Sequence, residues 1–296
     1  MATLRDIRQR INGVKKTQQI TKAMKMVAAA KLRRAQNRIL SARPFAYELA
    51  DMLGHLVTQV DVSLNPLLKP REVEKVCLVV VTSDRGLCGG FNSNLLRFTV
   101  AHIQKHYSSQ KEQGTLRLIC VGRKGYEYFN RRKFDIHRRY LGIFGRLSFA
   151  DIQDIVEDIK DDYLSGAFDR VEIVYNEFKS VAIPKITHEQ FLPIPPKDIK
   201  EESKSKAAVD YIYEPSPEEI VNKVIPKHLD THLWRVMLES NAAEEGSRMA
   251  AMDAATENAK ELIRTLNLTF NKARQAAITT EILDIVGGAN ALESSS

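Results

Sequence analysis

The first sixty residues contain a mostly apolar seam without a break in register, and this feature most restricts how the chain can fold. Apolar or small residues recur in steps of three and four, the spacing of a helix that packs along its length against another helix. Only Gln18, Thr21 and Lys25, which are consecutive on the seam, are polar. We therefore expect one helix over about residues 3–58. The seam consists of Leu4, Ile7, Ile11, Val14, Gln18, Thr21, Lys25, Ala28, Leu32, Ala35, Ile39, Ala42, Ala46, Leu49, Leu53, Leu56 and Val60.

A second helical run lies at the other end of the chain, over about residues 247–286. Pro226 and Gly246 are expected to interrupt the segment before it, and Gly287 follows it. Its seam is predicted to contain Met252, Ala255, Ala259, Leu262, Leu266, Ala273 and Ala276.

The apolar residues near the end of this second run spread around most of the helix. A helix that is apolar on all sides must be enclosed on all sides, yet little chain remains to enclose it. We therefore expect the tip to insert into another protein. The tip residues are Ala276, Ala277, Ile278, Ile282, Leu283, Ile285 and Val286.

Strand and helix patterns alternate between the two long helices. This alternation predicts a central α/β domain over residues 74–212, of Rossmann-like type. Two terminal helices, residues 1–60 and 216–290, can then pair as an antiparallel coiled coil. An ordinary helical bundle would show the same apolar stripes. The expected strands cover residues 75–82, 115–121, 136–142, 170–178 and 186–195, the last antiparallel, and the expected helices 92–107, 123–132 and 148–166.

The charge is concentrated at the start of the chain. Residues 1–43 contain twelve Lys or Arg and one acid, a net charge of +11, whereas the whole chain carries +7. This basic segment implies an acidic partner, which by charge alone is a protein, a nucleic acid or a membrane surface. The basic residues are spread around the helix without base-stacking aromatics, so we expect no nucleic-acid binding.

Two further features concern the compartment. The longest aliphatic run, residues 76–81, is too short to span a bilayer, and the N-terminus has no apolar signal core. Cys77, Cys88 and Cys120 form no C-x-x-C pair, which is typical of a reducing compartment and provides no metal site.

The segment Ser83-Asp-Arg-Gly-Leu-Cys-Gly-Gly90 lies between a strand and a helix, where phosphate-binding loops occur. It lacks the lysine of a P-loop and the spacing of a dinucleotide fingerprint, so we interpret it as a tight turn and expect no cofactor. Cys88 has no His nearby in sequence, which favours a plain loop thiol over a nucleophile. The acidic residues over 151–162 fit a solvated helix face rather than a calcium site. An enzyme built on the α/β domain stays open as an alternative.

The chain resembles the gamma subunit of F-type ATP synthase over essentially its whole length, and four segments carry this resemblance most specifically. They are Ile11-Asn-Gly-Val-Lys-Lys-Thr-Gln-Gln-Ile-Thr-Lys-Ala-Met-Lys-Met-Val-Ala-Ala-Ala-Lys-Leu-Arg-Arg-Ala-Gln36, Ser83-Asp-Arg-Gly-Leu-Cys-Gly-Gly-Phe-Asn92, Arg248-Met-Ala-Ala-Met-Asp-Ala-Ala-Thr-Glu-Asn-Ala259 and Asn271-Lys-Ala-Arg-Gln-Ala-Ala-Ile-Thr-Thr-Glu-Ile-Leu-Asp-Ile-Val-Gly-Gly-Ala289. The resemblance implies a non-catalytic central rotor of a bacterial-type proton-translocating ATP synthase. Such a rotor is peripheral on the cytoplasmic side of the cell membrane. Its partners would be the alpha and beta subunits of the catalytic hexamer, the epsilon subunit and the membrane c ring.

The resemblance also implies roles for particular residues. Arg248, Gln275 and Thr279 match positions that hydrogen-bond a loop of a beta subunit, and Met24, with Lys25 beside it, matches a position that faces beta. The foot on the c ring would contain Tyr211, Tyr213 and Glu214, and the bearing tip would contain Ile278, Ile282, Leu283 and Val286. Chloroplast members carry an extra segment with a regulatory cysteine pair, and no such pair occurs in this sequence, so no thiol switching is expected.

Overall fold

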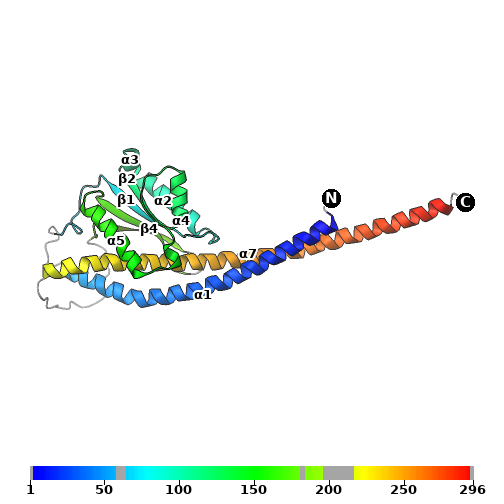
Figure 1. Cartoon of the computed structure of the whole chain (residues 1–296), viewed down its shortest axis with the longest axis horizontal. Helices are drawn as coiled ribbons and strands as arrows, with labels where there is room; N and C mark the ends of the chain where they lie inside the picture. Colours follow the sequence, from blue (N-terminus) through cyan, green and yellow to red (C-terminus); the bar gives the residue numbers. More distant parts are fainter. Residues whose placement is uncertain (1–2, 58–64, 181–183, 196–216, 294–296) are drawn as a thin grey trace. The chain divides into compact units, whose positions relative to one another are not determined.

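The computed structural model describes residues 3–57, 65–180, 184–195 and 217–293 (Figure 1). These residues form two compact units. The first consists of Met1–Val27 with Met249–Ser296, and the second of Ala28–Arg248. Both units contain a stretch of each long helix, and each unit is described separately below.

Helix α1, Leu4–Val57, confirms the helix predicted from the first seam. It begins at a reciprocal capping box, in which Asp6 N donates to Thr3 Oγ1 and Thr3 N donates to the Asp6 carboxylate. Each seam position from Leu4 to Leu56 is buried or half-buried. Pro44 lies inside the helix and does not end it.

Helix α7, Pro217–Glu293, is continuous, so the predicted interruptions at Pro226 and Gly246 are wrong. The helix starts at Pro217 as expected, because proline is tolerated at the first helical position. Residues around the two predicted breaks are packed in the second unit: Ile225 and Leu229 are fully buried, and Gly246 is buried. Burial of a whole helix face outweighs the low intrinsic propensity of single residues.

The two long helices run antiparallel within each unit, as predicted. In the first unit the Arg8 guanidinium lies 5.5 Å from the Phe270 ring centroid, and the hydroxyls of Thr21 and Thr256 are 2.8 Å apart. In the second unit the Lys31 ammonium lies 3.5 Å from Glu245. Partner numbers on α7 fall as those on α1 rise, which is the mark of antiparallel pairing.

The α7 seam differs from the prediction at two positions. Met252 and Ala259 are buried as expected, but the Leu262 side chain is 47% exposed and Ala276 is exposed. Ile263 is half-buried beside Leu262. Spacings of three and four residues fit a seam that passes through either Leu262 or Ile263. Packing against the partner helix decides which of the two faces the seam.

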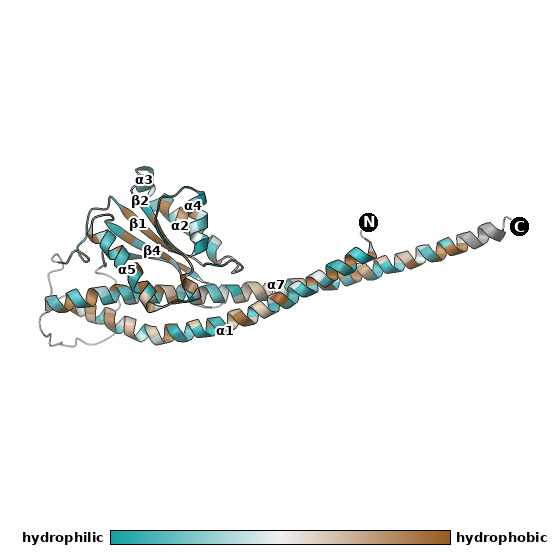
Figure 2. Ribbon diagram, viewed as in Figure 1, coloured by the Kyte–Doolittle hydropathy of each residue, from teal (hydrophilic) through white to brown (hydrophobic). Residues whose placement is uncertain are grey.

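The second unit contains a five-stranded sheet of order β3-β2-β1-β4-β5, which confirms the α/β prediction. The strands are β1 Val76–Val81, β2 Leu116–Val121, β3 Ile136–Tyr140, β4 Arg170–Glu177 and β5 Lys185–Leu192. The first four are parallel and β5 pairs antiparallel with β4. Val76–Val81 is buried at every position, because parallel strands are covered on both faces (Figure 2).

Helices cover both faces of the sheet. Helices α2 (Phe91–His106) and α4 (Arg123–Arg131) pack on the face of Leu78, through Leu95 and Phe129 among others. A short helix α3 (Ser108–Glu112), which the sequence reading missed, follows α2. Helix α5 (Phe149–Leu164) lies on the other side of the sheet (Figure 1). A 3-10 turn, η2 (Ile143–Gly145), precedes it.

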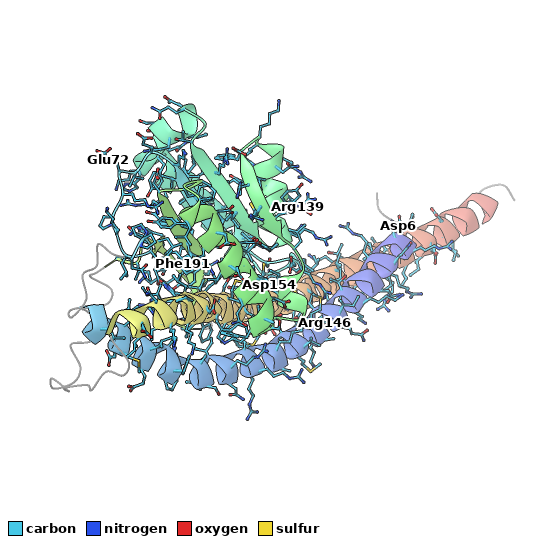
Figure 3. All side chains as sticks on the ribbon, turned by 60° about the vertical axis from the view of Figure 1, so that its left-hand side comes forward. Asp6, Glu72, Arg139, Arg146, Asp154 and Phe191 are labelled. Atoms are coloured by element: carbon cyan, nitrogen blue, oxygen red, sulfur yellow. The ribbon has the colours of Figure 1, made fainter. Side chains whose placement is uncertain are left out.

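The acidic face of α5 is only partly solvated, which corrects the sequence interpretation. The carboxylate of Asp162 accepts hydrogen bonds from His137 and Arg138 of β3, and Tyr140 donates to Asp158 at 2.6 Å. Asp154, labelled in Figure 3, is exposed. Two acids of this face therefore attach α5 to the edge strand of the sheet.

A polar network fastens the sheet to α7 within the second unit. The Glu189 carboxylate of β5 accepts hydrogen bonds from His232 at 2.8 Å and from Arg235 at 2.9 Å, both on α7. Tyr175 of β4 donates to the same carboxylate at 2.7 Å. These charge-assisted bonds fix the antiparallel edge of the sheet against the helix.

Candidate partner-binding surfaces

The α1 seam contains one polar step, formed by Gln18, Thr21 and Lys25. Thr21 and Lys25 have polar partners on α7 within the first unit. Thr21 meets Thr256, and the Lys25 ammonium lies 2.5 Å from the Asp253 carboxylate. Lys25 and Asp253 are 40% and 52% exposed, so their ion pair contributes little stability. Polar pairs at seam positions specify helix register, and we assign that role to this step. The sequence identified the polar residues on α1 but not their α7 partners, Asp253 and Thr256. Spacing along one helix does not show which residues of another helix lie opposite.

An apolar stripe lies on α1 beside this step. Ile20 is 61% exposed and Val27 is 57% exposed, and Met24 is half-buried one turn from each. The three residues share a helix face because they are separated by four and three positions. Exposed apolar side chains gathered on one face are typical of a protein-binding surface.

The C-terminal end of α7 extends beyond the α1 residues that can pair with it. Since Arg8 meets Phe270, the start of α1 at Leu4 leaves residues after about 274 without a helical partner among the described residues. Gln275 and Thr279 are exposed there, and the Thr279 hydroxyl donates to the backbone carbonyl of Gln275. Of the predicted tip residues, Ala277 is half-buried, Ala276 is exposed, and the large ones are exposed by 48% (Ile278), 53% (Ile282), 64% (Leu283), 72% (Ile285) and 50% (Val286).

Arg248 belongs to the second unit and is engaged within the chain. Its side chain is 11% exposed, and its guanidinium binds the Gly86 carbonyl and the Glu244 carboxylate. Burial raises the pKa of Glu244 to about 7, although the neighbouring Arg248 opposes this shift. Arg248 therefore makes its observed contacts within the second unit, and its predicted hydrogen bond to a beta subunit stays a prediction.

The loop between β1 and α2 has the geometry of a structural turn. Asp84 Oδ1 accepts hydrogen bonds from the backbone amides of Arg123 and Gly142, which ties together the ends of three parallel strands. Cys88 is 2% exposed, and burial raises the pKa of its thiol, so it is a poor nucleophile. It is the loop thiol that the sequence favoured, and the structure adds that it is buried.

The described residues contain neither a candidate metal site nor a candidate membrane span. No group of three or more His, Cys, Asp or Glu among them is placed to hold a metal ion. No helix in the described ranges has an apolar stretch long enough to cross a membrane. The predicted foot residues Tyr211, Tyr213 and Glu214 lie outside the described residues.

Comparisons with known proteins agree along the full chain. Residues 3–292 match the family model described as ATP synthase. The ATP synthase gamma chain of Chloroherpeton thalassium is 55% identical, covering 100% of both chains, and that of Chlorobaculum parvum is 56% identical, covering 99% of this chain and 100% of the relative.

Solved structures show the same fold. A chain from the central stalk and c-ring of Tetrahymena thermophila mitochondrial ATP synthase has a TM-score of 0.61 and 27% identity, covering 80% of this chain and 99% of that chain. A chain from the Euglena gracilis mitochondrial ATP synthase has a TM-score of 0.68 and 22% identity, covering 99% and 95%. With a match over nearly all residues and relatives above half identity, the chain belongs to the ATP synthase gamma chain family.

Proposed function

We propose that this gamma chain is the rotating central shaft of a proton-translocating ATP synthase of bacterial type. Rotation of a membrane c ring would turn the chain, and the asymmetric shaft would drive the three beta catalytic sites through different nucleotide affinities. Each orientation would favour a different site conformation, which is a population shift supplied by differential contacts. The chain itself would contribute no catalytic residue.

The observation that carries this proposal is the unpartnered end of α7. Five large apolar side chains between Ile278 and Val286 are about half or more exposed, on the part of α7 that extends past the described start of α1. We propose that Ile278, Ile282, Leu283 and Val286 seat in a sleeve formed by the alpha and beta subunits. Burial of such residues in a partner contributes roughly 1.5–3 kcal/mol each before association costs.

We propose that beta subunits contact the shaft at two further places. Met24 and Lys25 lie beside the exposed stripe of Ile20 and Val27, and Gln275 and Thr279 present exposed polar groups on the unpaired part of α7. Ten of the twelve basic side chains in the first 43 residues are exposed. They would meet acidic surfaces of the beta subunits, which favours fast, correctly oriented assembly.

The two remaining expected partners are the c ring and the epsilon subunit. The Tetrahymena structure that matches this chain is described as a central stalk with a c-ring. By analogy we propose that Tyr211, Tyr213 and Glu214 contact the c ring, with the epsilon subunit beside the sheet-containing domain. The chain would then be peripheral on the cytoplasmic side of the cell membrane.

Reconstitution tests the proposal. The purified full chain is mixed with alpha and beta subunits of a Chlorobaculum synthase, and complex size and ATP hydrolysis are measured, with alpha and beta alone as the control. We expect one large complex with sustained hydrolysis, from a chain that is inert alone. Absence of a complex with these related subunits, or substrate turnover by the isolated chain, would reject the shaft function.

A further inference from the structure

Helix α7 carries an unusual number of buried acidic side chains where it lies in the second unit. Glu239, Glu244 and Glu245 are 3%, 5% and 7% exposed. A buried carboxylate is costly unless a cation or hydrogen-bond donor faces it. Glu239 is faced by Arg43 at 3.7 Å and Arg235 at 3.8 Å. The other two acids are faced mainly by Arg248.

The Arg248 guanidinium makes three contacts at once. One terminal nitrogen donates to the Gly86 carbonyl, and the other donates to the Glu244 carboxylate. The Nε nitrogen lies 3.5 Å from Glu245, which Lys31 of α1 also approaches at 3.5 Å. A planar guanidinium with donors on both edges can make these contacts together, whereas the single ammonium of a lysine cannot.

Gly86 lies at the tip of the β1–α2 loop, and this tip is strained. Leu87 has a positive φ of 64° with a side chain that is 65% exposed. A leucine holds this left-handed conformation only where surrounding contacts fix it. The base of the loop is fixed from inside, because Asn92 donates to Ser83 at 2.7 Å and Ser83 donates to the Arg85 carbonyl at 2.7 Å. At the tip, Arg248 supplies a contact from α7.

We propose that Arg248 is a positioning residue that anchors the β1–α2 loop to helix α7. This role rests on the proposed rotor function, because a domain that receives torque must be joined stiffly to the helix that transmits it. The anchor joins the carboxyl edge of the sheet, where Asp84 already collects three strand ends, to the carboxylate pair Glu244–Glu245. It differs from the role that resemblance implied, in which Arg248 hydrogen-bonds a beta subunit.

Cys88 provides a direct readout of the anchor. The thiol is 2% exposed in this loop, whereas Cys77 and Cys120 are fully buried in β1 and β2. The experiment measures alkylation of each cysteine by iodoacetamide in the full chain, at one pH, with peptide mass spectrometry. The variants are R248Q, R248K and R97Q, the last removing an exposed arginine of α2 as the matched control.

We expect R248Q to raise the Cys88 alkylation rate at least tenfold while Cys77 and Cys120 stay at their wild-type rates. R248K should give an intermediate rate, and R97Q the wild-type rate. A wild-type Cys88 rate in R248Q would overturn the anchor. Equal acceleration of all three thiols would overturn it as well, because it would mean a general loss of stability.

The functional arm uses the complex with alpha and beta subunits in c-ring-containing membranes. R248Q should lower the number of protons pumped per ATP hydrolysed at least twofold, and R248K should restore part of the loss. Lost coupling with unchanged Cys88 reactivity would favour the contact to beta instead, and faster Cys88 alkylation with unchanged coupling would overturn the positioning role. Failure of the rotor function itself would appear separately, as a wild-type chain that does not assemble.

Discussion

Two glutamates of the second unit, half-buried Glu189 and buried Glu244, have pKa values shifted in opposite directions, and the reason is the number of donors that each carboxylate receives. Burial opposes the ionised form of Glu189, but His232, Arg235 and Tyr175 outweigh it and lower the pKa to about 2. Burial dominates at Glu244 and raises the pKa to about 7, against the effect of Arg248 and with Glu245 and Asp84 adding repulsion. The donors around Glu189 therefore offset the cost of burying its charge, whereas the single arginine beside Glu244 offsets only part of that cost.

The Glu244 shift predicts how stability depends on pH. The folded state holds the proton more tightly than the unfolded state, whose glutamate titrates near 4.5. The contribution of Glu244 to the free energy of unfolding is therefore fully present below pH 4.5 and is lost as the pH rises to about 7. At about 1.4 kcal/mol per pKa unit, a shift from 4.5 to about 7 corresponds to a loss of the order of 3 kcal/mol.

Urea denaturation of the wild type and E244Q between pH 5 and pH 8 tests this prediction. The wild type should lose stability as the pH rises, and E244Q should show a flatter profile. E257Q, which removes an exposed carboxylate of the same helix, is the matched control. Identical profiles for the wild type and E244Q would contradict the assigned cause.

At the scale of elements, the α1 seam should carry the packing energy of that helix. Ile39 is 4% exposed on the seam, and its neighbour Leu40 is 64% exposed. We expect I39A to lower the free energy of unfolding by about 2–4 kcal/mol, because it removes buried methyl groups and leaves a cavity. L40A should change it by less than about 0.5 kcal/mol.

Chemical denaturation of the two single variants gives the comparison directly, since both replace a four-carbon side chain in the same helix turn. Similar losses from I39A and L40A would mean that the seam face is not the buried face of α1.

At the scale of the whole molecule, the end of α7 should be dispensable for folding and necessary for assembly. A chain ending at Ala277 loses residues 278–287, all of which are exposed, together with the last nine residues of the chain, and should unfold at the wild-type temperature by calorimetry. In the complex with alpha and beta subunits it should bind more weakly and generate less torque. Full torque and complex stability without residues 278–296 would show that the tip is not the bearing.

A charge placed at Met24 should affect coupling more than assembly. Met24 is half-buried beside Ile20 and Val27, so a lysine there would add charge to an apolar stripe without entering the seam. We expect M24K to assemble normally and to hydrolyse ATP while pumping fewer protons per ATP. The measurement is the ratio of proton uptake to hydrolysis in membrane vesicles, with M26K, at an exposed position on the same helix, as the control. A wild-type ratio in M24K would contradict the placement of Met24 against beta.

The sequence by itself determined the elements, because helix and strand periodicities are local. The spacing of the first seam located α1 to within a residue at its start, and the buried run Val76–Val81 identified the central strand. Alternation of strands and helices gave the α/β class, and the four matching segments gave the family. The predicted domain boundaries, residues 1–60, 74–212 and 216–290, stay predictions.

Only the tertiary structure decided which side chains are buried and which residues they contact. Pro226 and Gly246 looked like helix breaks because their cost is local, whereas the burial that overrides it comes from residues distant in sequence. Leu262 and Ile263 fitted the same spacing, and packing against α1 selected between them. Arg248 matched a contact motif for a beta subunit, which stays a prediction, and only the structure showed that its guanidinium also binds Gly86 and Glu244. A sequence pattern shows which face of a helix is apolar, but the partner of a side chain depends on how distant segments are brought together in space.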